Sequence, residues 1–252
     1  MSSPPPALIV DRLSKSFGPL KAVDDVSFQV PRGETVGLLG GNGAGKTTTI
    51  SMALGLVTPT SGSVTVLGLS MATQSHLARQ RMNFESPYVD MPKRLTVRQN
   101  LTVYARLYSV PRHKDRIDEL AEDLELTTLL DREFGTLSAG QKTRAGLAKS
   151  LINVPDLLLL DEPTASLDPD TADWVRSYLE SYLENHNASI LLASHNMAEV
   201  ERLCGQIYMM VQGRIVDSGR PQRLIEHYGR TNLEEVFLDI ARGNATVAPV
   251  RQ

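Results

Sequence analysis

The sequence predicts an α/β fold in which a parallel sheet carries an inserted helical subdomain. Three observations lead to this prediction. Short apolar runs of strand length alternate with stretches of helical period before residue 86 and again after residue 155. One such run, residues 157–160, is four consecutive leucines, which is typical of a strand buried on both faces of a parallel sheet. From about residue 86 to residue 153 the pattern is helical alone, which predicts a helical subdomain within an α/β core.

The first part of the chain predicts strands that lead to a glycine cluster. Val26, Phe28 and Val30 alternate with polar neighbours, as in a strand with one buried face. Residues 35–39 are a short, mostly apolar run that ends in glycines, as expected of a buried strand feeding a loop. The predicted elements of this part are strands at 7–13, 26–30, 35–39 and 62–68, a turn at 31–34 and a helix from 46 to about 56.

The pattern of the middle of the chain predicts three consecutive helices. After them, predicted strands and helices alternate again. Val97, Leu101 and Tyr104 recur at helical spacing, and Ser138 is a suitable N-cap. The predicted helices are 96–109, 115–126, 138–153, 171–184 and 197–203, and the predicted strands are 157–160, 189–193 and a terminal hairpin of 207–211 with 213–217. We expect residues 1–252 to form one domain that ends in a hairpin and tail over 213–252.

Composition excludes several classes of protein. The 252 residues are 41% hydrophobic, and 26 Lys and Arg stand against 29 Asp and Glu, so no nucleic-acid partner is expected. The single cysteine permits no intrachain disulfide and favours a reducing compartment. No apolar run approaches the ~20 residues of a membrane helix, and the N-terminus has no signal-peptide pattern.

The glycine cluster fits the phosphate-loop pattern of Gly, four residues and Gly-Lys-Thr over residues 40–47. Glycines let backbone N–H groups approach phosphate oxygens, and the helix that follows presents its positive end to the anion. Lys46 is predicted to reach the β- and γ-phosphates, and the Thr47 hydroxyl to ligate Mg²⁺. The nucleotide-binding residues predicted here are Gly40, Asn42, Gly43, Ala44, Gly45, Lys46, Thr47 and Thr48.

Two carboxylates end the leucine strand. Carboxylates at the C-terminal end of a parallel strand lie where ligands bind in such sheets. Asp161 is predicted to hold Mg²⁺ through a water, and Glu162 to act as the general base toward the attacking water.

The segment Leu-Ser-Ala-Gly-Gln at 137–141 lies just upstream of this acidic strand end. It resembles the signature of the ATP-binding cassette (ABC) ATPases, and with the phosphate loop the resemblance extends over nearly the whole chain. A serine hydroxyl and a glycine N–H at a helix start form an anion site, so Ser138, Gly140 and Gln141 are implied to bind nucleotide.

The resemblance implies further site residues. Asp168, in the segment 166–168, is similar to the family's D-loop, and His195 to its switch histidine, which contacts the γ-phosphate. Phe17 matches the aromatic residue that stacks on adenine. No glutamine stands near residue 85, where the family has its Q-loop. Glu85 is the best match, and it would either orient water or Mg²⁺ or add a negative charge beside ATP.

The resemblance implies a P-loop α/β core with an antiparallel β subdomain and a helical subdomain. It also implies a cofactor pair of ATP and Mg²⁺, a head-to-tail homodimer that sandwiches two ATP molecules, and a separate transmembrane permease subunit at the cytoplasmic face of the membrane. Residues 95–101 and 233–238 resemble subunits of exporters. The alternatives are a soluble ABC ATPase outside transport and a regulatory nucleotide-binding module.

Overall fold

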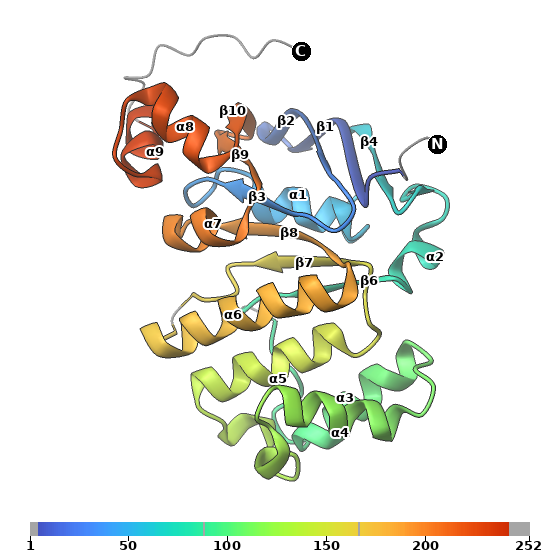
Figure 1. Ribbon diagram of the computed structural model, residues 1–252. Helices are drawn as coiled ribbons and strands as arrows, with labels where there is room; N and C mark the ends of the chain where they lie inside the picture. The colour runs from blue at the N-terminus through green and yellow to red at the C-terminus, as the bar shows by residue number, and fades with distance from the viewer. Residues whose placement is uncertain (1–4, 88, 166, 242–252) are drawn as a thin grey trace.

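The protein is described by a computed structural model for residues 5–87, 89–165 and 167–241 (Figure 1). Its centre is a six-stranded sheet of order β10-β9-β3-β8-β7-β6, parallel except for the β9–β10 pair. The strands are β3 (Thr35–Leu39), β6 (Met82–Glu85), β7 (Leu157–Asp161), β8 (Ser189–Ser194), β9 (Gln206–Val211) and β10 (Arg214–Gly219). The predicted parallel core and terminal hairpin are confirmed.

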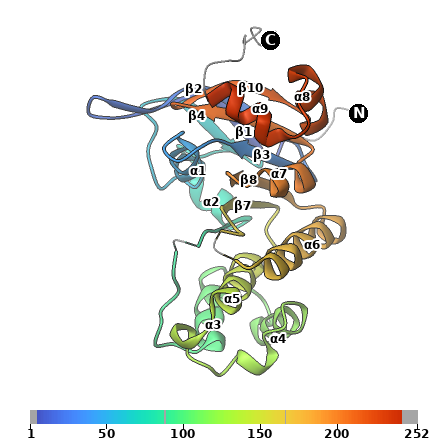
Figure 2. The same cartoon turned by 90° about the vertical axis from the view of Figure 1, so that its left-hand side faces the viewer.

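A second, antiparallel sheet of order β2-β1-β4-β5 packs beside the first (Figure 2). Its strands are β1 (Leu8–Phe17), β2 (Leu20–Val30), β4 (Ser61–Val66) and β5 (Leu69–Ser70). The strands predicted at 7–13 and 26–30 lie largely within β1 and β2, where Leu8 pairs with Val30. This sheet confirms the antiparallel β subdomain.

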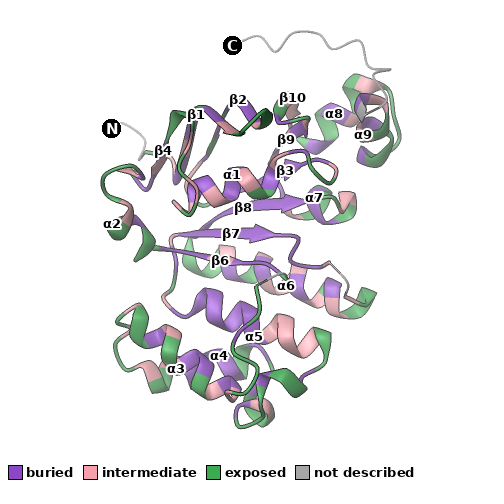
Figure 3. Ribbon diagram, turned by 180° about the vertical axis from the view of Figure 1, so that it is seen from behind, coloured by how far each residue is buried: buried purple, intermediate pink, exposed green. Residues whose placement is uncertain are grey.

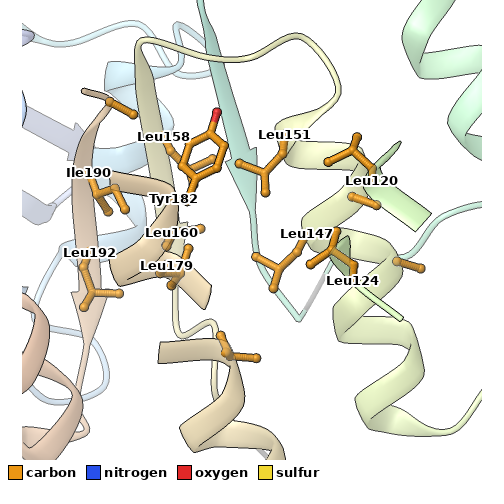
Figure 4. Packing of buried hydrophobic residues seen from close by; sticks show 14 of the residues in the cluster. Leu120, Leu124, Leu147, Leu151, Leu158, Leu160, Leu179, Tyr182, Ile190 and Leu192 are labelled. Carbon is orange, nitrogen blue, oxygen red and sulfur yellow. The ribbon is translucent and has the colours of Figure 1, made fainter. Parts of the chain in front are cut away.

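The leucines of β7 alternate between two hydrophobic clusters because successive side chains point to opposite faces of a sheet. Leu157 and Leu159 pack with the antiparallel sheet and with α1 (Lys46–Ala53). Leu158 and Leu160 pack with helices on the other face (Figure 4). These helices are α5 (Ala139–Leu151), α6 (Pro169–His186) and α7 (Met197–Leu203). Both faces of the parallel strands are therefore buried (Figure 3).

The inserted stretch forms α3 (Val97–Leu107), α4 (His113–Asp123) and α5, with short 3₁₀ turns at Thr127–Leu129 and Phe134–Thr136. Capping boxes set two helix starts: Thr96 with Gln99, and Ser138 with Gln141. The described residues between 86 and 96 form no helix, although the helical pattern was predicted to begin there. Pro87 and Pro92 lack the N–H that a helix interior requires.

Three helices were not predicted: α2 (Ser75–Arg79), α8 (Pro221–Tyr228) and α9 (Leu233–Ala241). In α9, Leu233, Val236 and Ile240 are buried at helical spacing, and the tail therefore packs onto the core. No helix among the described residues is both long and apolar enough to cross a membrane.

Candidate functional site

The phosphate loop connects the end of β3 to the start of α1 in the centre of the parallel sheet. Gly45, the residue before the helix, has φ 103° and Gly43 has φ 77°, angles that disfavour any side chain. At Gly40 a Cβ would lie 2.6 Å from the Met210 carbonyl oxygen of β9. The glycines therefore let this loop fold tightly against the adjoining strand.

Lys46 is buried at the first position of α1, with a side chain 6% exposed. Its Nζ donates a hydrogen bond to the Gly40 carbonyl oxygen at 2.6 Å and lies 3.5 Å from Glu162 Oε1. The Gly40 carbonyl oxygen and the Glu162 carboxylate thus fix the position of the Lys46 ammonium group at the loop.

Thr47 and Asp161 are in contact at the phosphate-loop cavity. The Thr47 hydroxyl donates to Asp161 Oδ2 at 2.8 Å, which joins the start of α1 to the end of β7. Burial raises the pKa of Asp161, while the Thr47 hydrogen bond lowers it. This pair offers only oxygen donors, and hard oxygen ligands with one carboxylate suit Mg²⁺, which takes its remaining ligands from water and phosphate.

Glu162 follows β7 and is held by contacts with β8 and with His195. Its backbone has φ 58°, a left-handed angle that is uncommon outside glycine, and its N–H donates to the Ala193 carbonyl oxygen at 2.8 Å. Its Oε2 lies 2.7 Å from His195 Nδ1 and accepts a hydrogen bond from the His195 N–H at 3.3 Å. Strained angles cluster at functional sites, where the surrounding structure imposes them.

Behind Glu162 lies a second carboxylate that was not among the predicted site residues. Glu199, near the start of α7, is fully buried, and its Oε2 accepts a hydrogen bond from the Ser194 hydroxyl at 2.6 Å. Ser194 Oγ also lies 3.5 Å from Glu162 Oε2. Burial raises the pKa of Glu199. The only sequence signal was Asn196 three residues earlier, at N-cap spacing.

Lys46, Thr47, Asp161 and Glu162 line one cavity of about 510 Å³, whereas Gly40, His195 and Glu199 are not among its lining residues. Phe17 lies at its edge with half of its surface exposed, as a ring that stacks on a planar base requires. The lining residues are Phe17, Leu20, Lys21, Ala22, Gly41, Asn42, Gly43, Ala44, Gly45, Lys46, Thr47, Thr48, Asp161, Glu162 and Gln212. Leu20 to Ala22, Gly41 and Gln212 were not among the predicted site residues. Leu20 to Ala22 and Gln212 were missed because only the fold brings strand β2 and the β9–β10 turn to the phosphate loop.

The signature residues lie elsewhere. Ser138 and Gln141 form the capping box of α5, and neither they nor Gly140 line the phosphate-loop cavity. A Cβ on Gly140 would lie 3.2 Å from Thr171 Cγ2, and Asp168 accepts hydrogen bonds from the Thr171 N–H and hydroxyl. Signature and D-loop aspartate are therefore neighbours, while Ser166 of the same segment is outside the described residues.

The structure also separates Glu85 from the cavity. Its carboxylate lies against α5, with Oε2 2.6 Å from Lys149 Nζ, and it does not line the phosphate-loop cavity. The structure thus places Glu85 outside this cavity, whereas the sequence had suggested a place beside ATP or Mg²⁺. The end of β6 directs this side chain to the inserted helices, and a buried lysine neutralises its charge.

The sequence of this chain resembles those of ABC transporter subunits. A profile of the family described as "ABC transporter" matches residues 23–165. The chain is 37% identical over 236 residues to the "Nod factor export ATP-binding protein I" of Ralstonia nicotianae, covering 93% of this chain and 73% of that protein. To the protein of the same name from Rhizobium johnstonii it is 40% identical over 224 residues, covering 88% and 72%.

Two solved structures are similar over almost their whole length. One is described as the "ATP binding subunit of ABC transporter", with TM-score 0.85 and 27% identity over 93% of this chain and 99% of that chain. The other is cbiO1 from Clostridium perfringens, part of the ABC transporter complex cbiONQ, with TM-score 0.78 and 26% identity over 94% and 96%.

Proposed function

This chain belongs to the ABC transporter family as an ATP-binding and ATP-hydrolysing subunit, and from that premise we propose how its residues act and what the transporter does. One observation carries the proposal. A single cavity brings together the Lys46 ammonium group, the Thr47–Asp161 oxygen pair and the Glu162 carboxylate. This set can bind a triphosphate, hold a divalent cation and accept a proton.

In the proposed reaction, the loop N–H groups and Lys46 bind the β- and γ-phosphates of ATP, and Phe17 stacks on the adenine. Glu162 accepts a proton from a water molecule that attacks the γ-phosphorus, so the bond to the β-phosphate oxygen breaks and ADP and phosphate form. His195 lies 2.7 Å from Glu162, with a side chain more than half exposed, and can both orient that carboxylate and reach a γ-phosphate.

Thr47 and Asp161 would hold Mg²⁺, whose charge offsets that of the phosphates. Within the described residues no cluster of three or more His, Cys, Asp or Glu side chains could hold a metal ion. One carboxylate and one hydroxyl are instead typical of a cation that reaches the site with its phosphates.

Removal of divalent cations with EDTA is therefore expected to stop hydrolysis. Thr47→Val should raise the Mg²⁺ concentration for half-maximal turnover several-fold, because it removes one proposed ligand. Ser51→Ala is the matched control, since this hydroxyl on the same helix donates to the Thr47 carbonyl oxygen and Ser51 does not line the cavity. A phosphate-release assay across a Mg²⁺ titration measures both, and equal curves for the two variants would contradict the Thr47 assignment.

The active unit is proposed to be a head-to-tail homodimer. Ser138, Gly140 and Gln141 stand at the N-terminus of the 13-residue α5, outside the cavity of their own chain. A helix N-terminus binds anions, so these residues can complete the ATP site of a second copy. Each ATP would then contact two chains, and its binding would favour the closed dimer.

Mixing two inactive variants tests this sharing. Ser138→Arg damages the signature and Lys46→Ala the phosphate loop, so each homodimer should turn over slowly. A heterodimer has one intact site and one doubly damaged site, which for random pairing gives about a quarter of the wild-type rate. Phosphate release by the mixture should exceed that of either variant. Loss of ATP binding by isolated Ser138→Arg chains would instead show that Ser138 serves its own cavity.

The transporter is proposed to be an exporter, because both relatives named above are export subunits. A separate membrane subunit would hold this chain at the cytoplasmic face and dock in the groove of about 250 Å³ between the loop after β6 and α5. Fractionation tests this proposal: the chain should sediment with membranes when the membrane subunit is co-expressed and stay in the supernatant without it. Supernatant in both cases would favour a non-transport ABC ATPase.

A further inference from the structure

A buried ion pair joins the parallel sheet to the signature helix. Glu85 ends β6 and pairs with Leu160 of β7 in the sheet ladder, while Lys149 belongs to α5. Their charged atoms lie 2.6 Å apart, and their side chains are only 9% and 6% exposed. Burying two charges is costly unless they pair closely, so their contact constrains how α5 lies on the sheet.

Gly146 makes room for this contact. It lies inside α5, and a Cβ there would overlap the Glu85 carboxylate. Glycine disfavours a helix interior, so its presence is explained by the close approach of the carboxylate to the helix backbone. The Lys149 Nζ also lies 6.0 Å from the centre of the Tyr104 ring of α3. The Glu85–Lys149 ion pair thus lies where β6, α5 and α3 come together.

We propose that Glu85 is a positioning residue for the ATP site of the second copy. Through Lys149 and the space at Gly146 it fixes the orientation of α5 on the core, and thereby the place at which Ser138–Gln141 meets the other chain's nucleotide. This rests on the proposed shared site. It assigns to Glu85 a role toward the partner's nucleotide, in place of contact with the nucleotide of its own chain.

The first test is a double-mutant cycle on ATP-driven dimerisation, in a Glu162→Gln background that retains ATP. Glu85→Gln and Lys149→Met should each lower closed-dimer formation about tenfold in size-exclusion chromatography, and the double variant no further. Nucleotide affinity of the isolated chains should stay unchanged, because neither residue lines the phosphate-loop cavity. Multiplicative losses, or a loss of nucleotide affinity, would overturn the proposal.

General loss of stability is controlled at the same helix. Leu151 is buried in the packing of α5 (Figure 4) and is not a member of the ion pair, so Leu151→Val removes one methylene from this packing. It should lower Tm yet leave dimer formation at the wild-type level. If the single variants prove unstable, Glu85→Met with Lys149→Met replaces the pair by apolar groups. That chain should fold and still dimerise poorly, and wild-type dimerisation by it would overturn the proposal.

The second test asks which chain's site Glu85 serves. In a mixture of Glu85→Gln and Lys46→Ala chains, one heterodimer site has an intact phosphate loop and an intact signature, so turnover should rise above that of either variant. No rise would overturn the proposal. The mixture of Ser138→Arg and Lys46→Ala chains separates the two explanations for such a result. If turnover rises in that mixture, only the proposed role of Glu85 is wrong. If turnover does not rise there either, the proposed shared ATP site is wrong.

Discussion

Replacing Glu162 with glutamine is expected to lower ATP turnover by about 10² to 10⁴, the usual contribution of a general base. The amide keeps the size of the side chain and can still meet His195, but it cannot take the proton from water. ATP binding should persist, and the closed dimer should accumulate with ATP. Phosphate release measures the first effect and size-exclusion chromatography the second.

Glu199→Gln is the matched control for this variant. It removes a buried carboxylate behind the site that contacts Ser194 and does not line the cavity. Its turnover should fall far less than that of Glu162→Gln. Comparable losses in the two variants would assign the effect to the hydrogen-bond network, and undiminished turnover in Glu162→Gln would reject Glu162 as the base.

Replacing Lys46 with alanine is expected to weaken ATP binding roughly tenfold to one-hundredfold. The change removes a charge-assisted hydrogen bond worth about 1.5–3 kcal/mol to a bound anion. It also leaves the Glu162 carboxylate without the ammonium group 3.5 Å away, so negative charge would face the phosphates. Calorimetric titration with a non-hydrolysable ATP analogue measures the affinity.

Lys93→Ala is the control, because this exposed lysine pairs with Asp90 on the helical side of the molecule. It should bind the analogue as the wild-type chain does. Equal affinities for Lys46→Ala and Lys93→Ala would remove Lys46 from the phosphate site.

Elements with clear local signals at their ends were the most predictable from sequence. The bounds predicted for β3 and α7 agree with the structure, since an apolar run before glycines and an Asn N-cap are local signals. The groups around Lys46 were predictable as well, because carboxylates that follow a buried strand lie at a known edge of the sheet.

Side-chain direction at Glu85 was not predictable. The motif gives its position, but its partner Lys149 lies in a distant part of the chain, and only the packing of α5 on β6 brings the two together. Helices α8 and α9 were missed for a related reason. Their apolar faces are short, and although Leu233, Val236 and Ile240 of α9 stand at helical spacing, helices of eight or nine residues depend on contacts with the core for their stability.

The position of β3 in the sheet has a consequence for the order of folding. Thr35 pairs with Ile190, and Val36 with Gln206, so both neighbours of this strand follow it by most of the chain. During synthesis, β3 can pair with β8 and β9 only after both have left the ribosome, whereas α3, α4 and α5 also contact one another within one continuous stretch of the chain. Contacts between distant segments form slowly. The helical subdomain is therefore expected to gain protection from hydrogen exchange first in refolding, and the nucleotide-binding loop last.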